Sequence, residues 1–189
     1  MFQLLESYIK SIAEIDQQSL NIIFSKFRLI KVRRNQTLVD YDEVCKNHYF
    51  VNKGGIRVYT INSEGVETSR YLAFEGEFGT ALPSLIDQKP AFEYLKTIEK
   101  SELLTISRTD FYLLVDQTPA FALVYRRILE KGFIIAQKRI YGFQGFSALE
   151  KVIWIKTHQP NFLLKVSNKM AASYLGISPS TLSRIKTKL

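Results

Sequence analysis

Residues 167–186 fit two short helices joined by a tight turn, a helix-turn-helix. Two helices that cross steeply need a small residue at the crossing, and Ala172 supplies it. Four residues later, Gly176 supplies the backbone freedom that a turn with positive φ requires. Ser178 can cap the second helix, and Pro179 stands at its first position, where a missing N–H costs nothing. The pattern therefore predicts this motif at the end of the sequence.

The two faces of this helix pair differ in chemistry. Its inward positions are apolar at helical spacing: Ala171, Leu175, Ile177, Leu182 and Ile185. Its outward positions carry hydroxyl and cationic side chains, which suit phosphates and base edges. The residues that we expect to contact double-stranded DNA are Ser167, Lys169, Ser178, Ser180, Thr181, Arg184, Lys186 and Lys188. Arg184 is the expected base reader, because a guanidinium can donate two hydrogen bonds to a guanine edge.

The net charge of +8 is concentrated in the same region. Residues 146–189 hold seven basic side chains and one acidic side chain, whereas residues 1–145 are close to neutral. A basic segment attached to a near-neutral one is typical of a nucleic-acid-binding module joined to another domain. The alternative is a solvated basic face that contributes to solubility, and each lysine taken singly could be such a surface charge.

The composition excludes several classes of protein. With one cysteine, Cys45, and two distant histidines, His48 and His158, the chain lacks the ligands of a Cys- or His-rich metal site, and we expect no metal or cofactor. No motif of a hydrolase, phosphate-binding loop or dinucleotide site occurs, so we expect no catalytic residues and no enzyme. A cupin-like enzyme would need several barrel histidines. Without a long apolar run or a signal peptide, we expect a cytoplasmic protein with no membrane partner.

Hydrophobic periodicity predicts an α+β fold. Residues 2–10 and 16–26 show helical spacing, whereas residues 27–107 alternate with period two between Gly- and Pro-containing turns. This alternation predicts an N-terminal antiparallel β-barrel of the jelly-roll type, also called a double-stranded β-helix. We expect three parts: a barrel domain with flanking helices over residues 1–118, a long helix over 119–145, and a helical head over 146–189.

The long helix has two apolar stripes. The first contains Phe121, Tyr125, Ile128, Gly132 and Ile135, and the second contains Leu129, Phe133, Ala136 and Ile140. One stripe suffices for packing on a barrel, so a second stripe favours pairing with a second copy of the chain. We expect the first stripe to form the interface of a homodimer. The alternative is one broad face buried within a single subunit.

A barrel, a long helix and a C-terminal helix-turn-helix together resemble the Crp/Fnr family. The stretches that carry the resemblance are residues 49–59, 74–79 and 171–185, and the last of these is similar to the family's Bacteroidetes-type members. The resemblance implies a bacterial transcription regulator whose barrel binds an effector, whose long helix dimerises and whose two heads read a palindromic operator. The β-hairpin wing that usually follows the recognition helix is not present before Leu189.

The cyclic-nucleotide cassette of that family is matched in its first half. Gly76-Glu77-Phe78-Gly79 fits the glycine-flanked stretch whose glutamate binds ribose, but Ala91-Phe92 stands where an arginine and a hydroxyl residue belong. A buried phosphate without its cation loses charge-assisted hydrogen bonds. These six residues are therefore the expected effector pocket, but for a ligand less anionic than cyclic AMP or cyclic GMP. Alternatively, the pocket is filled by its own side chains and Glu77 has a structural role.

Two functions from different classes remain after this reading. The leading expectation is a homodimeric DNA-binding transcriptional regulator, with or without modulation by an effector. The alternative is a small-molecule-sensing or protein-interaction module whose helix-turn-helix no longer binds DNA. Binding to random duplex DNA that weakens with salt would separate the two.

Overall fold

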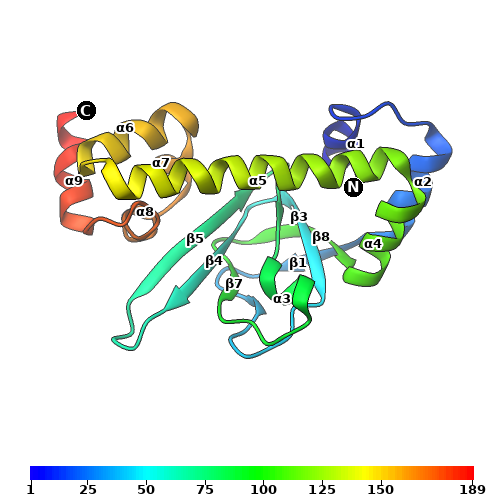
Figure 1. The fold of residues 1–189 in the computed structure, drawn as a ribbon, viewed down its shortest axis with the longest axis horizontal. Helices are drawn as coiled ribbons and strands as arrows, with labels where there is room; N and C mark the ends of the chain where they lie inside the picture. The colour runs from blue at the N-terminus through cyan, green and yellow to red at the C-terminus, as the bar shows by residue number, and fades with distance from the viewer. The chain divides into compact units, whose positions relative to one another are not determined.

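The computed structural model describes all 189 residues and divides the chain into two compact units. One unit comprises residues 1–59 and 71–130, and the other comprises residues 60–70 and 131–189. The expected long helix is present as α5 (Pro119–Gly145), an unbroken helix that supplies residues to both units (Figure 1). The compact units divide within α5, between residues 130 and 131, so the three-part division of the chain stays a prediction.

The strands form two four-stranded antiparallel sheets, which confirms the predicted jelly roll. The strand orders are β1-β8-β3-β6 and β2-β7-β4-β5. The strands are β1 (Arg28–Val32), β2 (Thr37–Val39), β3 (Asn47–Lys53), β4 (Gly55–Ile61), β5 (Glu67–Phe74), β6 (Phe78–Gly79), β7 (Tyr94–Thr97) and β8 (Ser101–Ser107). A short helix, α3 (Leu82–Asp87), connects β6 to β7.

The sheet that contains β3 and β8 is buried on both faces. Tyr49 and Val51 of β3 point into the core between the sheets, together with Leu103 of β8. Phe50, between them in sequence, points the other way and joins a second core with its cross-strand partner Leu104. This alternation is the period-two signal of the sequence, with both faces apolar because both are covered.

The second core is covered by helices that precede and follow the strands in sequence. They are α1 (Gln3–Lys10), α2 (Gln17–Lys26) and α4 (Arg108–Gln117), joined by the first turns of α5. Each helix inserts fully buried apolar side chains, such as Leu5, Leu20 and Phe111. Asp16 caps α2 by accepting a hydrogen bond from the Ser19 amide at 2.8 Å, as expected for a helix that begins there.

The two stripes of α5 face in different directions, and this corrects part of the predicted dimer interface. Phe121 is fully buried in the second core, and Tyr125 and Ile128 pack against that core. Phe121 therefore has no surface to offer a second copy. Gly132 is exposed and Ile135 is half-buried, so their role in an interface remains a prediction.

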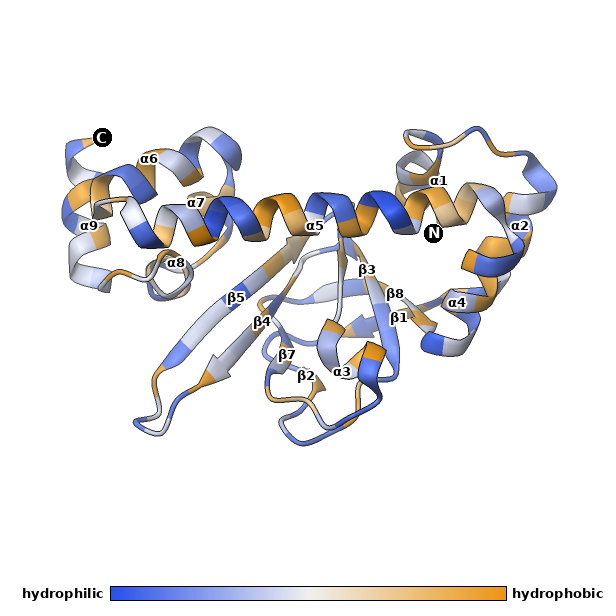
Figure 2. Cartoon of the chain, in the orientation of Figure 1, coloured by the Kyte–Doolittle hydropathy of each residue, from blue (hydrophilic) through white to orange (hydrophobic).

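The second stripe is the exposed one. Phe133 is 65% exposed, and Leu129 and Ile140 are 39% and 48% exposed. Figure 2 shows hydrophobic bands in orange between hydrophilic bands in blue along α5. The helix therefore presents an exposed apolar stripe about a quarter turn away from the side that packs on its own subunit.

None of the helices combines the length and the apolar character that crossing a lipid bilayer requires.

The buried side chain of His48 tests whether water is excluded from the second core. Its ring stacks on Phe111 with 3.9 Å between centroids, and burial lowers its pKa from 6.5 to about 3. The unfolded chain then binds a proton between these pH values that the folded chain does not bind, so stability falls as the pH is lowered from 6.5. We expect His48→Phe to reduce the loss of unfolding free energy between pH 7 and pH 5 by about 2 kcal/mol, measured by urea titration.

The matched control is His158→Phe, at an exposed position on the other unit. This variant should keep the pH dependence of the parent. An equally steep loss of stability in His48→Phe would contradict the assignment of a buried neutral imidazole.

Candidate nucleic-acid interface and effector region

The C-terminal head contains four helices, and the last two form the predicted helix-turn-helix. They are α6 (Ala148–His158), α7 (Phe162–Lys165), α8 (Asn168–Leu175) and α9 (Pro179–Lys188). At the start of α6, the Ser147 side chain accepts a hydrogen bond from the Glu150 amide, and the Glu150 carboxylate accepts one from the Ser147 amide at 2.7 Å. This reciprocal pair is a capping box, and it sets where the first helix of the head begins.

The turn between α8 and α9 has the geometry of a helix-turn-helix. Gly176 adopts a left-handed conformation with φ of +63°, which favours glycine. Ser167 caps α8 by accepting from the Met170 amide, and Ser178 caps α9 by accepting from the Thr181 amide at 3.1 Å. In addition, Asn168 Nδ2 donates to the Pro179 carbonyl oxygen at 2.9 Å, which ties the two helices together at their N-terminal ends.

A small apolar core fixes the angle between these helices. It is made of side chains that are nearly inaccessible: Val152, Ile155, Phe162, Ala171, Ala172, Tyr174, Leu175 and Leu182. The rings of Phe162 and Tyr174 meet with 4.9 Å between centroids. Sequence reasoning missed these two aromatic residues, although Tyr174 follows Ala171 at helical spacing. Ile177 and Ile185, which were expected to point inward, are half-buried at the margin of this core.

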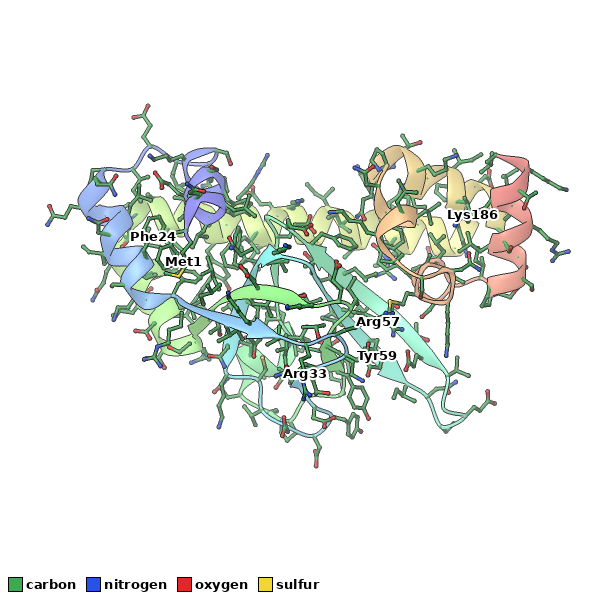
Figure 3. All side chains as sticks on the ribbon, turned by 180° about the vertical axis from the view of Figure 1, so that it is seen from behind. Met1, Phe24, Arg33, Arg57, Tyr59 and Lys186 are labelled. Atoms are coloured by element: carbon green, nitrogen blue, oxygen red, sulfur yellow. The ribbon has the colours of Figure 1, made fainter.

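The predicted DNA-contacting residues lie on or next to α8 and α9. Ser180, Arg184, Lys186 and Lys188 are exposed on α9, and Figure 3 shows Lys186 in the head. Ser167 and Lys169 are exposed at the start of α8. No Asp or Glu occurs after Glu150, so the side chains of α7, α8 and α9 include no acid that would repel phosphate. This arrangement can bind a polyanion and present a guanidinium to a groove.

The hydroxyl groups at the start of α9 form a connected cluster. Ser178 Oγ donates to Thr181 Oγ1 at 2.8 Å and lies 2.9 Å from Ser180 Oγ. The Arg184 guanidinium in turn donates to Thr181 Oγ1 at 3.4 Å. Ser178 and Thr181 therefore contact the polar ends of the exposed Ser180 and Arg184.

In the effector region, Glu77 makes hydrogen bonds within its own turn. Glu77 lies in the turn between β5 and β6, next to Gly76, whose φ is +82°. Its carboxylate accepts a hydrogen bond from the Phe74 amide at 3.1 Å, and its carbonyl accepts one from the Val51 amide at 3.0 Å. These bonds close the turn against β3, which is sufficient reason for an acidic residue at this position.

The other predicted pocket residues do not come together around one cavity. Phe78 is buried in the helix-covered core, whereas Ala91 is buried in the core between the sheets. Phe92 is 55% exposed, so the prediction that it lines or fills a pocket is wrong. Phe92 lies in a bend that precedes β7 (Tyr94–Thr97), and its side chain faces solvent there. Gly79 remains a close-approach position, where an added Cβ would lie 2.6 Å from Ile56 Cδ1.

Neither nearby lysine replaces the missing arginine inside the barrel. Lys89 is exposed after α3. The Lys96 amino group lies 5.7 Å from the centroid of the Tyr59 ring, on the face of β4 opposite the inner-core residue Val58. Arg57 lies over the same ring at 4.4 Å, and Figure 3 shows Arg57 and Tyr59 close together on this strand. The cations of this sheet are therefore on its outer face.

Comparison with known proteins agrees with this architecture. Residues 29–118 match the model of the family described as "Cyclic nucleotide-binding domain". The barrel is therefore similar to cyclic nucleotide-binding domains. No curated protein sequence matches the chain.

Solved structures extend the likeness beyond the barrel to the Crp/Fnr fold. FixK2 from Bradyrhizobium japonicum is 17% identical with a TM-score of 0.76, over 86% of this chain and 84% of that one. The c-di-GMP responsive global regulator CLP from Xanthomonas campestris is 14% identical with a TM-score of 0.71, over 92% and 91%. The catabolite activator protein of Thermus thermophilus is 19% identical with a TM-score of 0.59, over 94% and 85%. The chain therefore has the Crp/Fnr fold that its sequence predicted.

The geometry of the effector region leads to a binding prediction. Because Glu77 is engaged in the β5–β6 turn and no cation faces the inner core near Ala91, we expect no tight binding of cyclic AMP or cyclic GMP. Titration calorimetry with millimolar cyclic nucleotide should show no saturable heat. A dissociation constant in the low micromolar range would mean that Lys89 or Lys96 turns inward on binding, and this reading of the site would fail.

Proposed function

We propose that the chain is a DNA-binding transcriptional regulator of the Crp/Fnr type. The observation that carries the proposal is the head, in which a capped helix-turn-helix exposes Ser180, Arg184 and two lysines on α9. The absence of acidic side chains after Glu150 makes this surface electrostatically suited to a duplex. The comparison with FixK2 and CLP, which cover most of the chain, supports the same role.

We propose that α9 enters the major groove. Arg184 would contact base edges, whereas Lys169, Lys186 and Lys188 would contact phosphates. Ser167 and Ser180 would add hydrogen bonds to phosphate near the N-terminal ends of α8 and α9, where helix amides attract anions. Ser178 and Thr181 would contribute mainly by holding the start of α9 in place.

The regulator is proposed to act as a homodimer through α5. The exposed stripe of Leu129, Phe133, Ala136 and Ile140 has the spacing of a helix pair, and pairing with a second copy would remove its apolar surface from water. Such a dimer would present two heads to a palindromic operator. An effector, if the barrel takes one, would be less anionic than a cyclic nucleotide.

Substitution of Arg184 tests the assignment of the base reader. We expect Arg184→Ala to weaken binding to the preferred duplex by about 1–3 kcal/mol and to relax specificity at one base pair. Selection from random duplexes followed by titration of the selected site measures both effects. Lys188→Ala is the comparison, because loss of a phosphate contact should weaken all sequences alike and lower the salt dependence.

An Arg184→Ala variant as tight and as selective as the parent would show that another residue reads the base. If the parent itself binds no duplex at any salt concentration, the chain is a sensing or interaction module with an inactive head.

The exposed stripe of α5 gives a test of dimerisation. Light scattering of the parent at micromolar concentration should give twice the chain mass of 21.8 kDa. Phe133→Asp and Ile140→Asp should each give a single chain mass, because a carboxylate facing its own copy would lose water without gaining a partner. Lys138→Asp, at an exposed position off the stripe, should remain dimeric. A monomeric parent would rule out the proposed pairing.

A further inference from the structure

The tip of the β4–β5 hairpin is part of the same compact unit as the head. Residues 60–70 group with residues 131–189, and the tip is closed by a hydrogen bond from the Asn62 amide to the Val66 carbonyl at 3.1 Å. β5 is the outermost strand of its sheet, so its outward amides and carbonyls have no neighbouring strand to pair with. Within this unit, the groups at the start of β5 pair with the head instead.

One hydroxyl group of α8 satisfies two backbone groups of β5. The Ser69 amide donates to Ser173 Oγ at 2.8 Å, and Ser173 Oγ donates to the Glu67 carbonyl oxygen at 2.8 Å. The Glu67 carbonyl and the Ser69 amide point to the same side of β5, because backbone groups two residues apart in a strand share a direction. Ser173 therefore occupies the place that an adjacent strand would take. Ser69 is fully buried where β5 contacts α8.

Arg139 of α5 completes the contact from a second direction. Its guanidinium donates to the carbonyl oxygens of Arg70, Ser69 and Tyr174, the last two at 3.4 and 3.3 Å. It also lies over the Tyr174 ring at 4.2 Å from the centroid. All of its acceptors are backbone carbonyls, so a single side chain links α5, β5 and α8.

We propose that these contacts form a latch that holds the reading head at one orientation to the hairpin. The latch comprises Glu67, Ser69 and Arg70 on β5, Arg139 on α5 and Ser173 on α8. Because α8 is tied to α9 through Gly176 and Asn168, fixing α8 also fixes the reading helix. The three latch residues of β5 belong to the last strand in the β2-β7-β4-β5 order.

The consequence for DNA binding rests on the proposed function. None of the latch residues belongs to the reading surface, and Ser180 and Arg184 stay exposed while the latch is closed. A closed latch therefore pre-organises the head without covering it. Two heads that must fit one duplex at a fixed spacing lose less orientational freedom on binding when each is already held.

Amide exchange tests whether the latch exists in solution. In Ser173→Ala, which keeps a good helix former in α8, we expect the Ser69 amide to exchange about fivefold faster or more, as for the loss of one hydrogen bond. Ser63→Ala is the matched control, because Ser63 is exposed in the turn of the same hairpin. Unchanged exchange of Ser69 in Ser173→Ala would overturn the latch.

Duplex binding tests what the latch does. The probes are the two-half-site duplex that the parent selects from a random library, and a shorter duplex with one half-site. Ser173→Ala and Arg139→Gln should bind the two-half-site duplex about fivefold more weakly or worse and the half-site duplex as the parent does, because only the former requires two oriented heads. Lys138→Gln, with the same loss of charge on an exposed position of α5, should match the parent on the two-half-site duplex.

The two experiments separate the possible failures. Faster exchange with unchanged affinity for both duplexes would overturn the orienting role, and so would an equal loss on both duplexes. If the parent binds neither duplex, the proposed function and the orienting role fail together. The exchange of Ser69 would then still decide whether the hairpin and the head are joined.

Discussion

The burial of one strand pair on both faces organises the barrel domain. β3 and β8 send Val51 and Leu103 into the core between the sheets, and Phe50 and Leu104 into the core under the helices. Each apolar side chain thus contributes to one of two cores that share a single backbone layer. The N-terminal helices and α4 are then required, because without them half of this surface would face water. The first turns of α5 complete the same cover, so the long helix is anchored at its beginning by the strand pair.

Local patterns in the sequence predicted the head well. Helix caps depend on residues three positions apart, so Ser147, Ser167 and Ser178 could be recognised without knowledge of the fold. The turn at Gly176 is equally local, because its left-handed φ restricts the residue type. The jelly roll was predictable from a long run of period-two alternation, although the order of its strands was not. The helix-turn-helix and its exposed cationic face were therefore readable from the chain alone.

Features that depend on distant packing were less accessible. Two stripes on α5 are visible in the sequence, but which of them packs on its own subunit depends on the position of Phe111 and the other core residues, and Phe121 was assigned to the wrong side. Phe92 was misplaced because it lies in a bend before β7, where no period-two pattern fixes the direction of a side chain. The sequence did not indicate the roles of Ser173 and Arg139. Their partners on β5 are backbone carbonyl and amide groups, which every sequence possesses.

The pairing of Ser173 and Arg139 with β5 also bears on solubility. An outer strand with unpaired amides and carbonyls is a template on which another chain can add a strand, and a dimer with two such strands could grow into longer assemblies. Charged or exposed side chains protect many such edges, but the start of β5 is closed by a helix of the same polypeptide. Opening of the head would therefore expose a site for β-sheet extension, and the chain has a reason to keep this contact even when no DNA is bound.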